Sequence, residues 1–103
     1  MLYDGALRFI GMARAAIERR DIPARSEAIS RALAIVGHLR TTLDVERGGD
    51  VARSLDQLYD YVTSRLLDAS FTQQTGPLDE AVKVLSTLRD GWVSIATTPP
   101  ATP

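Results

Sequence analysis

Hydrophobic residues along this chain recur every three or four positions, and polar breaks divide the pattern into four segments. This spacing is typical of amphipathic helices, whereas strands would show strict alternation of apolar and polar residues. Segments of about 20 residues also exceed the usual length of a strand. The pattern therefore predicts four long helices. The breaks between them are Asp21-Ile22-Pro23, Arg47-Gly48-Gly49-Asp50 and Thr75-Gly76-Pro77.

The breaks also carry residues that favour the start of a helix. Asp21 and Asp50 are N-cap candidates, because an aspartate oxygen accepts hydrogen bonds from the free N–H groups of a first turn. Pro23 and Pro77 suit a first turn, where the missing N–H of proline costs nothing. Asp79 adds a negative charge near the positive end of the last helix dipole. Each break is therefore expected to end one helix and begin another.

Short connections between long helices favour antiparallel neighbours. The predicted fold class is all-α, with the helices in an antiparallel up-down-up-down four-helix bundle. A chain of 103 residues is long enough for one core and too short for two. We expect residues 1–96 to form this bundle domain. Residues 97–103 are rich in Pro and Thr and lack large apolar side chains, so we expect a disordered tail there.

The apolar faces of the predicted helices differ in width. The third helix has an arc of roughly 100°, against roughly 160° for the second, 180° for the fourth and 220° for the first. A small bundle encloses one seam of side chains, so part of the wide faces should remain exposed and mark an interaction site. The alternative is that wide faces reflect close packing of alanine. The third arc contains Val51, Leu55, Leu58, Tyr59, Val62, Leu66 and Ala69, and the fourth extends to Trp92, Val93 and Ile95.

Composition and charge exclude several classes of function. Lys and Arg number 12 against 13 Asp and Glu, and a net charge of −1 provides no basic field for nucleic acid. The absence of cysteine removes disulfides and thiolate metal sites. Neither a long apolar run nor the order of residues in a signal peptide appears in the sequence. We expect a cytoplasmic protein that does not insert into membranes.

Candidate chemistry is sparse. His38 is the only histidine and is expected at the surface, so no histidine pair for a metal exists. The Gly48-Gly49 pair lies between helices and not after a strand, so it is interpreted as a turn and not as a phosphate loop. Asp56, Asp60 and Asp68 have arginines nearby on the same helix, a spacing typical of solvated ion pairs. We expect no enzyme, no catalytic residues, no metal and no cofactor, and an enzyme using His38 with a helix carboxylate remains the formal alternative.

Several motifs in this sequence stand in the order and spacing of a known family. They are Leu2-Tyr3-Asp4-Gly5-Ala6-Leu7-Arg8-Phe9-Ile10, then Leu43 with Gly48-Gly49-Asp50-Val51-Ala52, then Leu55-Asp56-Gln57-Leu58-Tyr59-Asp60-Tyr61 with Arg65-Leu66, and finally Leu88-Arg89-Asp90-Gly91-Trp92. Together they resemble the FliS family of flagellin export chaperones over nearly the whole chain. Family members usually carry further residues before the first motif, whereas this sequence begins at Met1. We expect Leu2 and Phe9 to be less protected as a result.

The resemblance implies a cytoplasmic helical bundle in a bacterium. In this family the bundle binds the C-terminal segment of flagellin, prevents premature polymerisation and aids export by the flagellar type III secretion system. Flagellin would place apolar side chains in grooves between helices. The wide apolar faces are where such docking is expected. Proteins of the export apparatus and other flagellar proteins are further candidate partners. The alternative is a helical protein of the flagellar system that forms homo-oligomers, for example a homodimer through the first helix, and binds a different client.

Candidate partner-binding positions follow from the motifs and from the helical wheels. Tyr3 and Asp4 have the strongest motif support, and Tyr61 is either a recognition aromatic or an ordinary surface residue. Positions on the second and fourth helices depend on the wheel alone. The predicted binding or groove-supporting residues are Tyr3, Asp4, Leu7, Ile10, Ile29, Leu33, Val36, Tyr59, Tyr61, Val84 and Leu88.

Overall fold

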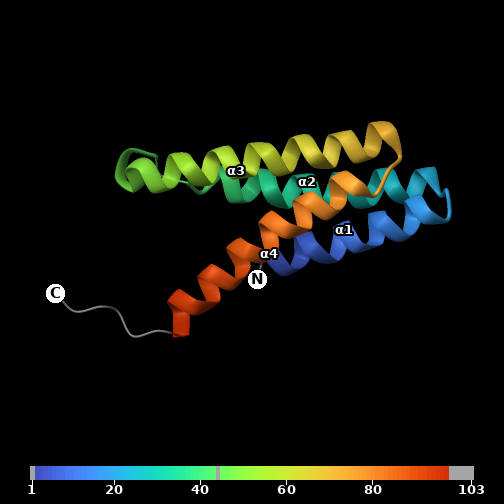
Figure 1. Cartoon of the computed structure of the whole chain (residues 1–103). Coiled ribbons are helices and arrows are strands. Elements are labelled where there is room, and N and C mark those ends of the chain that lie inside the picture. The colour runs from blue at the N-terminus through green and yellow to red at the C-terminus, as the bar shows by residue number, and fades with distance from the viewer. Residues whose placement is uncertain (1, 44, 98–103) are drawn as a thin grey trace.

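The computed structural model describes the backbone of residues 2–43 and 45–97, and their side chains apart from residues 45, 47 and 92–97. These residues form four helices, α1 (Leu2–Glu18), α2 (Ile22–Thr41), α3 (Val45–Thr72) and α4 (Gly76–Thr97). Consecutive helices run in opposite directions, and α4 crosses the other helices obliquely (Figure 1). Contacts join α1 with α2, α2 with α3, α3 with α4, and α4 with α1. The prediction of an all-α four-helix bundle is confirmed.

The turn between α1 and α2 shows why the chain reverses there. The backbone N–H of Asp21 donates to the carbonyl of Ala16 at 2.8 Å, and that of Arg20 donates to Ile17 at 3.1 Å. These two bonds form a Schellman motif, with Arg20 in the left-handed region at φ 60°. Asp21 then caps α2, because its Oδ1 accepts from the N–H of Ala24 at 3.1 Å. The predicted N-cap is confirmed.

Replacing Arg20 by glycine is expected to stabilise the protein by about 0.5–1 kcal/mol. A side chain raises the energy of the left-handed conformation, whereas glycine adopts it without strain. Urea denaturation of Arg20→Gly measures the gain as a higher midpoint with an unchanged slope. The control is Arg19→Gly, because Arg19 is not in the left-handed region. Glycine there adds chain entropy and removes the exposed ion pair of Arg19 with Asp21 at 3.5 Å, so it should not stabilise the protein. Equal effects of the two substitutions would contradict the assignment of strain to Arg20.

The break at Gly48 and Gly49 differs from the predicted turn. The first turn of α3 begins at Val45, before the glycines, and the helix continues through a kink at Gly49, where φ is 56° and ψ is −131°. A Cβ atom on Gly48 would lie 2.6 Å from the Cβ of Ala52. The kink therefore depends on both glycines, because Gly48 leaves room for Ala52 and Gly49 adopts a positive φ. Asp50 follows it and pairs with Arg53 at 2.9 Å.

The core lies between all four helices. Alanines that are almost fully buried bring α1 and α2 together, and they are Ala6, Ala13, Ala16, Ala28 and Ala32. Close packing of alanine, the alternative interpretation of the wide faces, therefore accounts for much of the first two helices. Larger side chains fill the space toward α3 and α4. Those that are fully buried are Ile10, Val36, Val62, Leu66, Leu78 and Leu85.

Exposed apolar side chains gather on α3, where the sequence predicted the narrowest apolar face. Within the described part of the chain, Leu2, Met12 and Ile22 are the large apolar residues exposed on α1 and α2, whereas α3 exposes Val51, Leu58, Tyr61, Leu67 and Phe71. The expectation that surplus apolar surface lies on the first, second and fourth helices therefore holds for Leu2 and Met12 of α1, but it missed α3, which exposes more such residues among the described side chains. The expected exposure of Leu2 is confirmed at 43%, while Phe9 is half-buried.

The exposed apolar residues of α3 lie along the length of the helix. Val51 near its start is 71% exposed, and Leu67 and Phe71 near its end are 52% and 91% exposed. The helices that pack beside α3 are α2 and α4. The exposed side chains therefore lie where these two helices leave α3 uncovered.

The C-terminal end of the chain is only partly described. Helix α4 includes Thr97, the residue at which the predicted tail begins. Residues 98–103 lie outside the described residues, as do the side chains of Trp92, Val93 and Ile95. The division into a bundle and a disordered tail stays a prediction.

Candidate functional site

The predicted partner-binding residues occupy different environments in the structure. Asp4 and Tyr61 are exposed, and Leu7, Leu33, Val84 and Leu88 are half-buried and pack against the core. The remaining residues are buried in the core, beneath the exposed and half-buried ones. These buried residues are Tyr3, Ile10, Ile29, Val36 and Tyr59.

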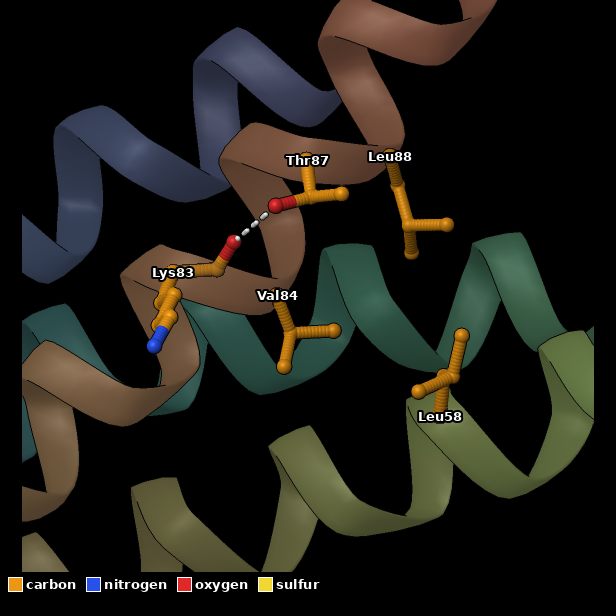
Figure 2. Close-up of a pocket in the computed structure, with 5 residues that line it drawn as sticks. All are labelled: Leu58, Lys83, Val84, Thr87 and Leu88. Carbon is orange, nitrogen blue, oxygen red and sulfur yellow. Dashed lines mark hydrogen bonds between the residues drawn. The ribbon is translucent and has the colours of Figure 1, made fainter.

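A groove between α3 and α4 brings two of the half-buried residues together. It has a volume of about 240 Å³ and is lined by Leu58, Lys83, Val84, Thr87 and Leu88, which we call the α3–α4 groove. Figure 2 shows Leu58 pointing from α3 toward α4, and Val84 and Leu88 pointing from α4 toward α3. The groove is therefore mainly apolar, with polar side chains at one edge.

The sequence predicted only part of this groove. Val84 and Leu88 were predicted from wheel position, whereas Leu58, Lys83 and Thr87 were not. Leu58 lies on the predicted apolar arc of α3, yet it is 37% exposed. The sequence alone does not indicate this exposure, because it depends on how α2 and α4 pack against α3.

A polar cluster lies beside the groove on the same two helices. The hydroxyl of Tyr61 donates to Glu80 Oε2 at 3.1 Å, and Arg65 Nη1 approaches the same oxygen at 3.3 Å. The Arg65 guanidinium also stacks over the Tyr61 ring at 5.7 Å and pairs with Asp68. Desolvation and the bond to Glu80 raise the pKa of Tyr61. This cluster fixes the ring of Tyr61 on the surface and neutralises Glu80.

Two motif tyrosines form a hydrogen bond inside the bundle. Tyr3 of α1 and Tyr59 of α3 are 5% and 2% exposed, and their hydroxyl groups bond to each other. Burial, followed by the bond to Tyr3, raises the pKa of Tyr59. The bond links two helices that are otherwise diagonal in the bundle. It helps to set the position of α1 along α3.

Tyr3→Phe is expected to destabilise the protein by about 1–3 kcal/mol, because the buried hydroxyl of Tyr59 loses its partner. The double variant Tyr3→Phe/Tyr59→Phe removes both hydroxyl groups and should recover part of this loss. Urea denaturation of the two single variants and the double variant gives the coupling free energy. Additive losses would contradict a bond between the two hydroxyl groups.

Ion pairs between helices hold the surface of the bundle. Arg40 of α2 pairs with Asp56 at 2.6 Å and with Asp60 at 3.4 Å on α3. The hydrogen bond to Arg40 lowers the pKa of Asp56. The prediction of pairs within the third helix is correct for Asp68, which pairs with Arg65. It is wrong for Asp56 and Asp60, because the nearest partner lies on the neighbouring helix.

Features of catalytic and metal sites were also sought among the described residues. His38 is exposed near the end of α2, as predicted. In the described ranges, no three His, Cys, Asp or Glu side chains gather closely enough to hold a metal ion. No helix of the described chain is both long and apolar enough to cross a membrane. Among the described residues, the α3–α4 groove is a feature that offers apolar surface for an interaction.

Fold and groove together define a small helical bundle with an apolar surface between two of its helices. The model of the family described as flagellar protein FliS matches residues 1–99, so the chain belongs to the FliS family. Flagellar secretion chaperone FliSB of Pseudomonas aeruginosa is 41% identical over 96 residues, covering 93% of this chain and 76% of that protein. Flagellar secretion chaperone FliS of Salmonella typhimurium is 37% identical over 97 residues, covering 93% and 72%. The protein of the same name from Bacillus subtilis is 36% identical over 92 residues, covering 89% and 68%.

Proposed function

We propose that this protein is a flagellar secretion chaperone that binds the C-terminal segment of flagellin in the bacterial cytoplasm. By holding this segment, the protein prevents flagellin from polymerising before the flagellar type III secretion system exports it. Membership of the FliS family and the names of the relatives support the chaperone role. The function requires binding only, with no catalytic residue and no cofactor.

The α3–α4 groove is the observation that carries this proposal. Leu58, Val84 and Leu88 present apolar atoms to solvent along two neighbouring helices. Apolar side chains that stay exposed add little to the stability of a bundle, and contiguous apolar surface commonly marks a binding site. A helix of a partner can place its apolar face in a groove of this kind, with anchors three and four residues apart. The client segment is therefore proposed to bind as a helix at this surface, with Tyr61 at its edge.

Titration calorimetry tests the proposal with the full chain and a peptide of the C-terminal segment of flagellin from the same organism. We expect one-to-one binding with a negative heat-capacity change, because a disordered segment would fold onto apolar surface. A peptide of the same composition in scrambled order is the control. If a folded protein gives no heat with the flagellin peptide, the proposed client is wrong. Ultracentrifugation of the free protein, run in parallel, tests the homodimer alternative through the dependence of mass on concentration.

A further inference from the structure

The α3–α4 groove carries an unpaired positive charge on its edge. Lys83 is the only lysine in the sequence, and its side chain lines the groove beside Val84 (Figure 2). Within the described residues, no carboxylate lies within 4 Å of its ammonium group. An exposed charge without a partner beside an apolar groove is available to a ligand.

The acidic neighbours of Lys83 on α4 bind elsewhere. Asp79 and Glu80 lie four and three residues before it, which are the positions from which a carboxylate pairs with a lysine on a helix. Asp79 instead pairs with Arg14 of α1. Glu80 accepts hydrogen bonds from Tyr61 and Arg65 of α3. Both carboxylates are therefore paired with residues of other helices and not with Lys83.

Two arginines that bridge helices differ from Lys83, because each has a carboxylate partner within the bundle. Arg40 of α2 pairs with Asp56 of α3, and Arg89 of α4 pairs with Asp4 of α1. Both arginines are partly buried. The bundle thus pairs its interhelical arginines internally and leaves the charge at the groove unpaired. An occupant with an acidic side chain at the matching position would complete this edge, as complementary charges do at other interfaces.

Resting on the proposed function, we propose that the α3–α4 groove selects an amphipathic helix of its client with an aspartate or glutamate that pairs with Lys83. Its apolar side chains contact Leu58, Val84 and Leu88, and its acidic residue lies beside this apolar face. The apolar contacts supply most of the affinity. The ion pair fixes the register of the client helix in the groove, because it forms in only one alignment.

A charge-swap titration tests this inference. Each Asp and Glu of the flagellin C-terminal peptide is replaced by Lys, one at a time, and every peptide is titrated into wild-type protein and Lys83→Glu. We expect Lys83→Glu to weaken binding of the natural peptide about 3- to 10-fold, as for a partly exposed ion pair. One substituted peptide should bind Lys83→Glu more tightly than the natural peptide does. The control Arg53→Glu makes the same change in charge on the outer side of α3 and should change affinity less than about twofold.

The outcomes separate the inference from the function on which it rests. Failure of the wild-type protein to bind any of these peptides would overturn the proposed function and the inference together. Binding by the wild type with no rescue by any peptide, and equal effects of Lys83→Glu and Arg53→Glu, would overturn the inference alone. Rescue by a single substituted peptide would support it and identify the acidic residue of the client.

Discussion

Leu85→Ala is expected to destabilise the protein by about 2–5 kcal/mol, the largest change in stability that we predict for a single substitution. Leu85 is fully buried, and it packs in the core that all four helices share. Alanine keeps the helical propensity of α4, so the loss reports the missing packing and the remaining cavity. Because a domain of this size has a total stability of about 5–15 kcal/mol, the variant would lose a large part of it.

Urea denaturation followed by circular dichroism measures the effect, with an unchanged slope as the sign of a two-state comparison. The matched control is Leu67→Ala on the outer face of α3. Leu67 is 52% exposed, so the same truncation should change stability by less than about 0.5 kcal/mol. Equal losses in the two variants would mean that α4 does not pack into the bundle as described.

The positions of the helices could be predicted because their ends depend on local chemistry. Asp21 caps α2 with its own side chain, and Pro77 lies in the first turn of α4. Both signals act within a few residues of the helix end. The same reasoning was incomplete at Gly48 and Gly49. A glycine pair indicates a change of direction, but it does not indicate that the helix already begins at Val45 and continues through a kink at Gly49.

The two tyrosines of α3 show which part of the site the sequence could predict. Tyr59 and Tyr61 are two residues apart, so a helix directs them to different faces. Tyr59 was expected at the edge of the core and Tyr61 outside the apolar arc, and the structure buries the first and exposes the second to 44%. The partners of these rings were not predictable, because Tyr3 and Glu80 come from other helices.

The groove itself was hidden from a helical wheel. A wheel assigns Leu58 to a buried arc, yet whether that arc is covered depends on how α2 and α4 pack against α3. From the sequence alone, Lys83 cannot be distinguished from an ordinary surface lysine. Its lack of a partner follows from the ion pairs of Asp79 and Glu80 with other helices. Features that arise from the packing and contacts of helices therefore appear only in three dimensions.

Leu58→Glu is expected to weaken binding of the flagellin C-terminal peptide by about 30-fold or more, the largest effect on binding that we predict. Leu58 faces Val84 and Leu88 across the α3–α4 groove, and a carboxylate there would lose hydration beneath an apolar helix. Leu58 is 37% exposed, so the free protein should fold normally, as its urea midpoint would show. The control Leu67→Glu makes the same change on the outer face of α3 and should bind like the wild type. Unchanged binding by Leu58→Glu, or an equal loss in Leu67→Glu, would place the client on another surface of the bundle.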